Sequence, residues 1–154
     1  MNISFSFLPD YWPYFRDGVY YTLVLAFLTV VIAVLPAICL ALMRLSNNKI
    51  LRFISSAFIE IIRGTPMLVQ VSIIYYGVFG AVKLPNHMLF GFMNFAMFLP
   101  CIIALAINSS AYVAEVIRAG ILAVDRGQTE AARSLGMTQG QCMRMIVLPQ
   151  AVKN

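Results

Sequence analysis

The sequence predicts an all-α integral membrane protein with three transmembrane helices, an interfacial helix and a helix-turn-helix element outside the bilayer. Hydrophobic residues make up 61% of the 154 residues and charged residues only 11%, whereas soluble domains have about 45–50% and about 25%. The segment 18–43 contains no charged residue. This uncharged segment is longer than the roughly 20 residues that a helix needs to cross the hydrocarbon.

The first expected span covers residues 18–43. It is too long for a cleaved signal peptide, and its N-terminal flank has too few positive charges for one. Pro36 lies inside it, and a proline leaves one backbone carbonyl of the helix without its usual donor. We therefore expect a kinked helix that is packed in a bundle, where a neighbour satisfies that carbonyl.

The segment of residues 50–63 has the pattern of an amphipathic helix. Apolar residues recur on one stripe at helical spacing and polar residues lie off that stripe. The stripe consists of Phe53, Ile54, Ala57, Phe58, Ile61 and Ile62. We expect this helix to lie at the interface or against the bundle rather than to cross the membrane alone.

A second crossing is expected over residues 64–82, starting at a break formed by Gly64, Thr65 and Pro66. Glycine and proline interrupt or redirect a helix. An interrupted helix can expose backbone groups and the Thr65 hydroxyl to a translocation path. The alternative is a simple hinge between the interfacial and spanning helices, and the residues alone do not separate the two.

A third span is expected over residues 88–114, with two distinct faces. Asn108, Tyr112 and Glu115 share one face, and small residues including Ser110 and Ala114 share the opposite one. The small residues suit close helix packing, and an ionisable group near the membrane is a functional hypothesis. The alternative is that Glu115 forms a structural ion pair with Arg118, and that the Asn and Tyr only bond adjacent helices.

A helix-turn-helix element is expected over residues 125–149. Asp125 is placed to cap a first helix, and Gly136 lies where a left-handed residue ends one. Thr138 and Gln141 have the spacing of a capping box, which starts a second helix that we expect to end near Pro149. These cues are common, so an ordinary capped surface hairpin is the alternative.

The full spacing of this element favours a specific interpretation. Glu130-Ala131-Ala132 is followed after three residues by Gly136, after nine more by Ile146, and after one more by Leu148-Pro149. This pattern resembles the cytoplasmic loop, called the EAA motif, of the membrane subunits of binding-protein-dependent ABC importers. Residues 63–70, residues 108–115 and Gly127-Gln128 are similar to the branch that imports polar amino acids.

The resemblance implies a permease subunit for polar amino acids, which is a transporter component and not an enzyme. Its implied partners are ABC ATPase subunits, an extracytoplasmic amino acid-binding protein, membrane lipid and a second permease subunit, in a homo- or heterodimer. The chain itself is expected to bind no cofactor, because ATP is bound by the ATPase. The implied ATPase-coupling residues are Gly127, Gln128, Glu130, Ala131, Ala132, Gly136, Ile146, Leu148 and Pro149. The candidates for the translocation path are Gly64, Thr65, Pro66, Gln70, Asn108, Ser109, Tyr112 and Glu115.

Positive charge predicts the orientation in the plasma membrane. The N-terminal flank and the turn after the second expected span carry only Arg16 and Lys83, and the other nine basic residues face the opposite side. Short cytoplasmic loops collect Lys and Arg. We therefore expect the N-terminus outside and residues 125–149 in the cytoplasm. Because these basic residues lie between apolar spans, we do not expect nucleic acid binding.

No other chemistry competes with this interpretation. The sequence has no phosphate-binding loop, its three cysteines are widely spaced, and its single histidine, His87, has no nearby partner for a metal. No catalytic or metal-binding residues are therefore expected, and an intramembrane enzyme ranks last because only Glu115 is a candidate group.

The length departs from the family pattern. The chain stops at Asn154, whereas family members continue through about two more membrane helices to a fold of about five spans. We therefore expect a C-terminally incomplete permease domain. The alternatives are a fragment that does not transport by itself and a membrane scaffold or assembly protein that does not bind an ATPase.

Overall fold

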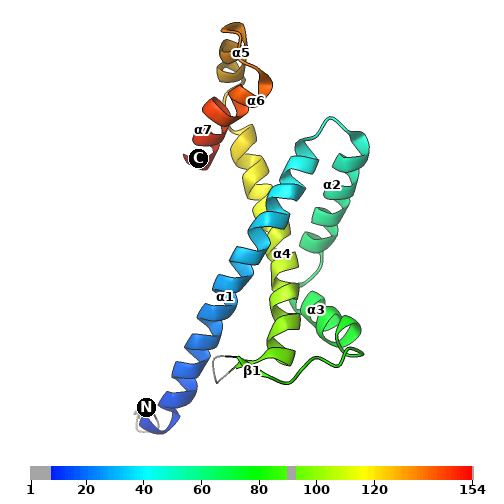
Figure 1. Cartoon of the computed structure of the whole chain (residues 1–154), viewed down its shortest axis with the longest axis vertical. Coiled ribbons are helices and arrows are strands. Elements are labelled where there is room, and N and C mark those ends of the chain that lie inside the picture. Colours follow the sequence, from blue (N-terminus) through cyan, green and yellow to red (C-terminus); the bar gives the residue numbers. More distant parts are fainter. Residues whose placement is uncertain (1–7, 90–92, 154) are drawn as a thin grey trace, which may run out of the picture. The chain divides into compact units, whose positions relative to one another are not determined.

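The computed structural model describes residues 8–89 and 93–153, and most of them are helical (Figure 1). The chain divides into two compact units. One consists of Met1–Ile32 and Met67–Ala106, and the other of Ala33–Pro66 and Ile107–Asn154. The helical elements are α1 (Leu8–Leu45), α2 (Lys49–Gly64), α3 (Met67–Ser72), η1 (Ile73–Val78), α4 (Phe95–Leu122), α5 (Arg126–Ser134), α6 (Gln139–Cys142), η2 (Met143–Val147) and α7 (Leu148–Lys153). Helices α1 and α4 contribute to both units.

Two of the described helices, α1 and α4, are long and apolar enough to cross a membrane. A third crossing is present if α2 and the helical segment after it are taken as one broken span. This bears out the all-α membrane fold. The helical part of the crossing expected over residues 64–82 is shorter than predicted, because α3 and η1 follow each other directly and together cover only Met67–Val78. At about 1.5 Å per residue, such a segment does not cover about 30 Å of hydrocarbon.

In the first unit, the start of α4 differs from the expected start near Met88. Strands β1 (Met88–Leu89) and β2 (Met93–Asn94) form a short antiparallel hairpin, in which Met88 pairs with Asn94. The Asn94 side chain then accepts a hydrogen bond of 3.0 Å from the Ala96 N–H, as a helix cap does. In the same unit the ring of Tyr21 lies 5.4 Å from that of Phe98 and joins α1 to α4.

In the second unit, small residues let three helices approach closely. Ala37 and Ala41 of α1, Ala111 and Ala114 of α4, and Ile59 of α2 form a core whose members are at most 1% exposed. Alanine side chains allow helix backbones to come near each other. The expected small-residue face of the third span therefore packs as predicted at Ala114, and its partner face on α1 also consists of alanines.

Helix α2 folds back beside the end of α1 (Figure 1). Its N-cap is Asn48, whose side chain accepts from the Ile50 N–H at 2.9 Å. The buried face of α2 is centred on Ser55 and Ile59, and the Ser55 hydroxyl donates to the Leu40 carbonyl at 2.7 Å. The expected apolar stripe is consequently divided: Phe53 is 72% exposed. The hydrogen bond from Ser55 to the Leu40 carbonyl places the face of α2 that carries Ser55 against α1.

Candidate functional site

The first helix of the expected helix-turn-helix element is α5, and it begins as predicted at Asp125. The Asp125 carboxylate accepts a hydrogen bond of 2.6 Å from the Gly127 N–H. A β-carbon built on Gly127 would lie 2.8 Å from the same carboxylate oxygen. Glycine at position 127 therefore leaves room for the cap, a steric reason for the residue that the sequence pattern does not reveal.

The corner between the two helices is built on Gly136, the glycine with positive φ in the part of the chain that the structure describes. Its φ is +86°. The Gly136 N–H donates to the Arg133 carbonyl at 3.0 Å, and the Met137 N–H donates to the Ala132 carbonyl at 3.2 Å. These two bonds form a Schellman motif, which requires a left-handed residue at this position. The predicted role of Gly136 as a helix-ending residue is confirmed.

The second helix starts with the predicted capping box. The Gln141 N–H donates to the Thr138 hydroxyl at 3.3 Å, and the Thr138 N–H donates to the Gln141 side chain at 2.9 Å. The expected end near Pro149 is wrong, because the helix continues through α6, η2 and α7 to Lys153. Proline lacks an N–H and its ring obstructs a regular helical turn. The wider turn of η2, which precedes Pro149, accommodates it.

A small apolar core holds this helical hairpin, residues 125–153, to the end of α4. Val124, Ala132, Cys142 and Val147 are each at most 8% exposed. The partly buried residues packed against them are Ile121, Met137, Met143, Ile146 and Ala151. Part of the motif therefore has a structural role, because its second alanine, Ala132, and its isoleucine, Ile146, pack inward.

The other residues of the motif face outward. Glu130 and Ala131 are exposed, and so are Gln128 and Pro149. Leu148 is 39% exposed. The hairpin therefore presents a carboxylate and a slim alanine surface, which permits a partner to approach closely.

Gly120, which belongs to none of the sequence motifs, sets how closely the hairpin lies to α4. A β-carbon built there would lie 2.9 Å from the Ala151 carbonyl oxygen. Backbone oxygen cannot move aside as a flexible side chain does, so any larger residue would displace α7. Gly120 and Ala151 are 31 positions apart in the sequence, and no local spacing signals their contact.

A second cluster in the same unit surrounds the Glu115 carboxylate. Arg118 contacts it at 3.1 and 3.3 Å, Arg63 at 3.7 Å, and Arg44 through a hydrogen bond from its guanidinium. The predicted Glu115–Arg118 pair is present, and two further arginines from α1 and α2 join it. Glu115 therefore links three helices.

Tyr112 belongs to this cluster as well, because the Arg63 guanidinium lies 5.3 Å from its ring centre. The Glu115 side chain is only 17% exposed, and those of Arg44 and Arg118 are 20% and 29% exposed. Such an arrangement is a cation–π contact beside a mostly desolvated ion cluster. Tyr112 and Glu115, both candidates for the translocation path, are thus joined through one arginine.

The other path candidates are distributed differently. Asn108 is buried and Ser109 is half-buried on α4, whereas Gly64, Thr65 and Pro66 are exposed at the break after α2. The Thr65 hydroxyl donates to the Ile61 carbonyl at 3.0 Å. Gln70 is buried on α3, in the other unit. A translocation role for these residues stays a prediction.

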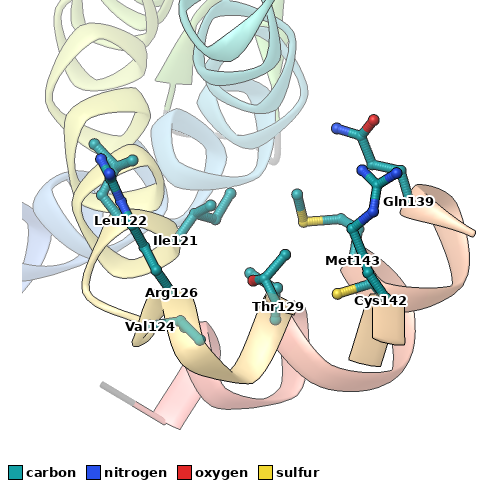
Figure 2. A pocket seen from close by; sticks show the side chains of 10 residues that line it. Ile121, Leu122, Val124, Arg126, Thr129, Gln139, Cys142 and Met143 are labelled. Carbon is teal, nitrogen blue, oxygen red and sulfur yellow. The ribbon is translucent and has the colours of Figure 1, made fainter. Parts of the chain in front are cut away.

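The hairpin also encloses a pocket with a volume of about 410 Å³. Its lining comes from the end of α4, from Val124 in the following turn, and from α5, α6 and η2. Figure 2 shows Thr129 between Ile121 on one side and Cys142 and Met143 on the other.

Residues 30–154 match the protein family described as "Binding-protein-dependent transport system inner membrane component". The chain belongs to this family. Its members are membrane components of transporters rather than enzymes, which agrees with the sequence prediction.

The chain is similar to several relatives of this kind. It is 38% identical over 154 residues to the arginine transport system permease protein ArtQ of Bacillus subtilis, which covers all of this chain and 66% of that protein. It is also 38% identical over 151 residues to a putative glutamine transport system permease protein, GlnP, of Rickettsia prowazekii, covering 96% of this chain and 65% of that one.

The chain is also similar to a protein of known structure. The crystal structure of an amino acid ABC transporter with histidines contains a chain that is 50% identical to this one, with a TM-score of 0.83. The match covers 99% of this chain and 67% of that chain. The chain therefore spans about two thirds of the length of the permeases that it resembles.

Proposed function

We propose that the protein is a permease subunit of an ATP-driven ABC importer, and that it forms part of the translocation pathway for polar amino acids. The observation that carries this proposal is the 50% identity over 99% of the chain to a chain of an amino acid ABC transporter. The names of the curated relatives, which include arginine, glutamine and cystine permeases, support the same class of substrate.

The helical hairpin is proposed to couple this subunit to a separate ATPase. It is the polar end of an otherwise apolar chain, and it carries the exposed Glu130 beside a rigid Gly136 corner. Local hydrogen bonds at both helix caps and the apolar core below α5 hold the hairpin rigidly against α4. A displacement of the hairpin by the ATPase is therefore proposed to move α4 as well. ATP is proposed to bind to the partner, since the sequence contains no phosphate-binding loop.

Charge supports a cytoplasmic location for the hairpin. Nine of the eleven basic residues fall in the unit that contains the hairpin, and only Arg16 and Lys83 fall in the other. Cytoplasmic segments next to membrane helices collect Lys and Arg. We propose that the N-terminal end of α1 faces the exterior, where a binding protein delivers the amino acid.

Exposed apolar side chains on α1 form a surface for lipid or for another membrane subunit. Leu23, Phe27 and Leu35 are 64–70% exposed, as expected for a surface covered by lipid or by another permease subunit. The proposed assembly contains two permease subunits, identical or different, and paired ATPases.

Transport by the complete assembly tests this function. The protein is expressed from its natural gene, combined with an amino-acid-type ABC ATPase and a binding protein of the same organism, and reconstituted in liposomes. We expect ATP-dependent accumulation of a labelled polar amino acid such as arginine or glutamine, and none when the binding protein is omitted. Accumulation that needs neither ATP nor the binding protein would contradict the proposal.

A further inference from the structure

The pocket inside the hairpin has a closed apolar floor and an open charged rim. Val124, Cys142 and Val147, which form the floor, are 2–8% exposed. Arg126, Arg133 and Gln139 line it from exposed positions. Its volume of about 410 Å³ lies within the range of sites that hold small organic groups, about 300–1,000 Å³.

The walls of the pocket are fixed by the same bonds that build the hairpin. One wall is α5, held by the Asp125 cap and by the two bonds at Gly136. The opposite wall starts at the Thr138 capping box. Because both ends of the corner are fixed, the pocket is a preformed cavity, and preformed cavities lose little entropy when they are filled.

The charged residues that line the pocket are all basic. Its lining includes two arginines and no acidic residue. Within residues 8–89 and 93–153, neither Arg126 nor Arg133 has a carboxylate within 4.0 Å. The apolar cavity can hold an apolar group, and the two arginines beside it can pair with a carboxylate next to that group.

The surroundings indicate that this group belongs to a protein outside the bilayer. The sequence of α5 is RGQTEAARS, in which alanine is the only hydrophobic residue type, so the helix does not face hydrocarbon. A lipid chain is therefore a poor occupant. Arg126 and Arg133 line the pocket from exposed positions on α5, so a side chain of a protein that docks along this edge of the helix can enter the pocket.

We propose that this pocket receives an aliphatic or aromatic anchor side chain of the ATPase subunit, flanked there by an Asp or Glu that pairs with Arg126 and Arg133. This inference rests on the proposed function and adds to it where and by what chemistry the ATPase is held. Buried anchors in preformed pockets carry most of the binding energy of protein interfaces. The outward face of α5 then serves mainly to fit the partner surface.

The test measures the affinity of the purified amino-acid-type ABC ATPase of the same organism for the full-length permease in detergent. Thr129→Trp fills the pocket from α5. Its matched control is Val152→Trp, which adds the same bulk on α7 at a position that is 87% exposed and does not line this pocket. We expect at least about a tenfold loss of affinity for Thr129→Trp and a change of less than about threefold for the control.

The charged rim is tested separately, so that a folding defect in Thr129→Trp cannot obscure the answer. The double substitution Arg126→Gln and Arg133→Gln should reduce the salt dependence of binding, whereas Lys153→Gln on α7 should not. Thermal unfolding of every variant reports its folding. Wild-type affinity for a folded Thr129→Trp, or unchanged salt dependence for the double variant, overturns this inference and leaves the proposed function standing. An ATPase that does not bind the wild-type permease overturns both.

Discussion

Replacing Glu115 with glutamine is expected to lower the stability of the protein strongly. The carboxylate is shared by guanidinium groups of Arg44, Arg63 and Arg118, and glutamine leaves these three cations with a single counter-charge among the described ion pairs, the exposed Glu60 near Arg44. Removing one partner of a mostly buried ion pair costs on the order of 3 kcal/mol, and solvent around the more exposed Arg63 reduces the loss. A loss of this size lowers the unfolding temperature by roughly 6–12 °C.

Glu60→Gln is the matched control for this prediction. The Glu60 side chain is 73% exposed and lies 3.9 Å from Arg44, so its loss should cost less than about 1 kcal/mol. Thermal unfolding of both variants in the same detergent makes the comparison. Equal unfolding temperatures for the two variants would show that Glu115 is no structural hub. If Glu115→Gln keeps wild-type stability but abolishes uptake, Glu115 acts in the translocation path instead.

Replacing Gly136 with alanine is expected to uncouple ATP hydrolysis from transport while the subunit still inserts in the membrane. The φ of Gly136 is +86°, a conformation that costs other residues about 1 kcal/mol or more. A β-carbon built there meets no atom within 4 Å. The effect therefore comes from the backbone alone, which must change the angle of the corner and misdirect the second helix of the hairpin.

Gly140→Ala separates this effect from a general loss of glycine. Gly140 lies four residues further on, in α6, also meets no atom within 4 Å, and has no left-handed φ. Reconstituted transporters carrying each substitution are compared for ATP hydrolysis and amino acid uptake. We expect Gly140→Ala to transport at wild-type rates and Gly136→Ala to hydrolyse ATP with little uptake. Normal uptake by Gly136→Ala would refute the coupling role of the corner.

The hairpin was predictable from the sequence because its geometry is made by local hydrogen bonds. Asp125, Gly136 and the Thr138–Gln141 pair each act on backbone groups within a few residues, so residue type and spacing specify the result. The passage of the helix through Pro149 was not predicted. Proline normally marks a helix end, and only the wider turn of η2 before it removes the conflict.

The clusters that depend on long-range contacts were not predictable in the same way. Arg44 reaches Glu115 across 71 positions, and the sequence indicated only the neighbouring Arg118. Gly120 and its contact with Ala151 likewise depend on how α7 folds back onto α4. The expected start of α4 near Met88 is too early, because the strand residues Met88, Leu89 and Met93 are as apolar as the first turn of a membrane helix.

The central claim is that the hairpin lies on the cytoplasmic side, where an ATPase can grip it, and cysteine labelling tests this most directly. The native Cys142 is only 2% exposed and is a poor reporter, so the three native cysteines are removed and Leu135→Cys is introduced on the hairpin, at a position that is 85% exposed. Tyr14→Cys, at a 75% exposed position near the start of α1, is the reference for the exterior. In intact cells, a membrane-impermeant maleimide should label Tyr14→Cys at once and Leu135→Cys only after permeabilisation. Labelling of Leu135→Cys in intact cells would place the hairpin outside, away from any ATP, and would contradict the account.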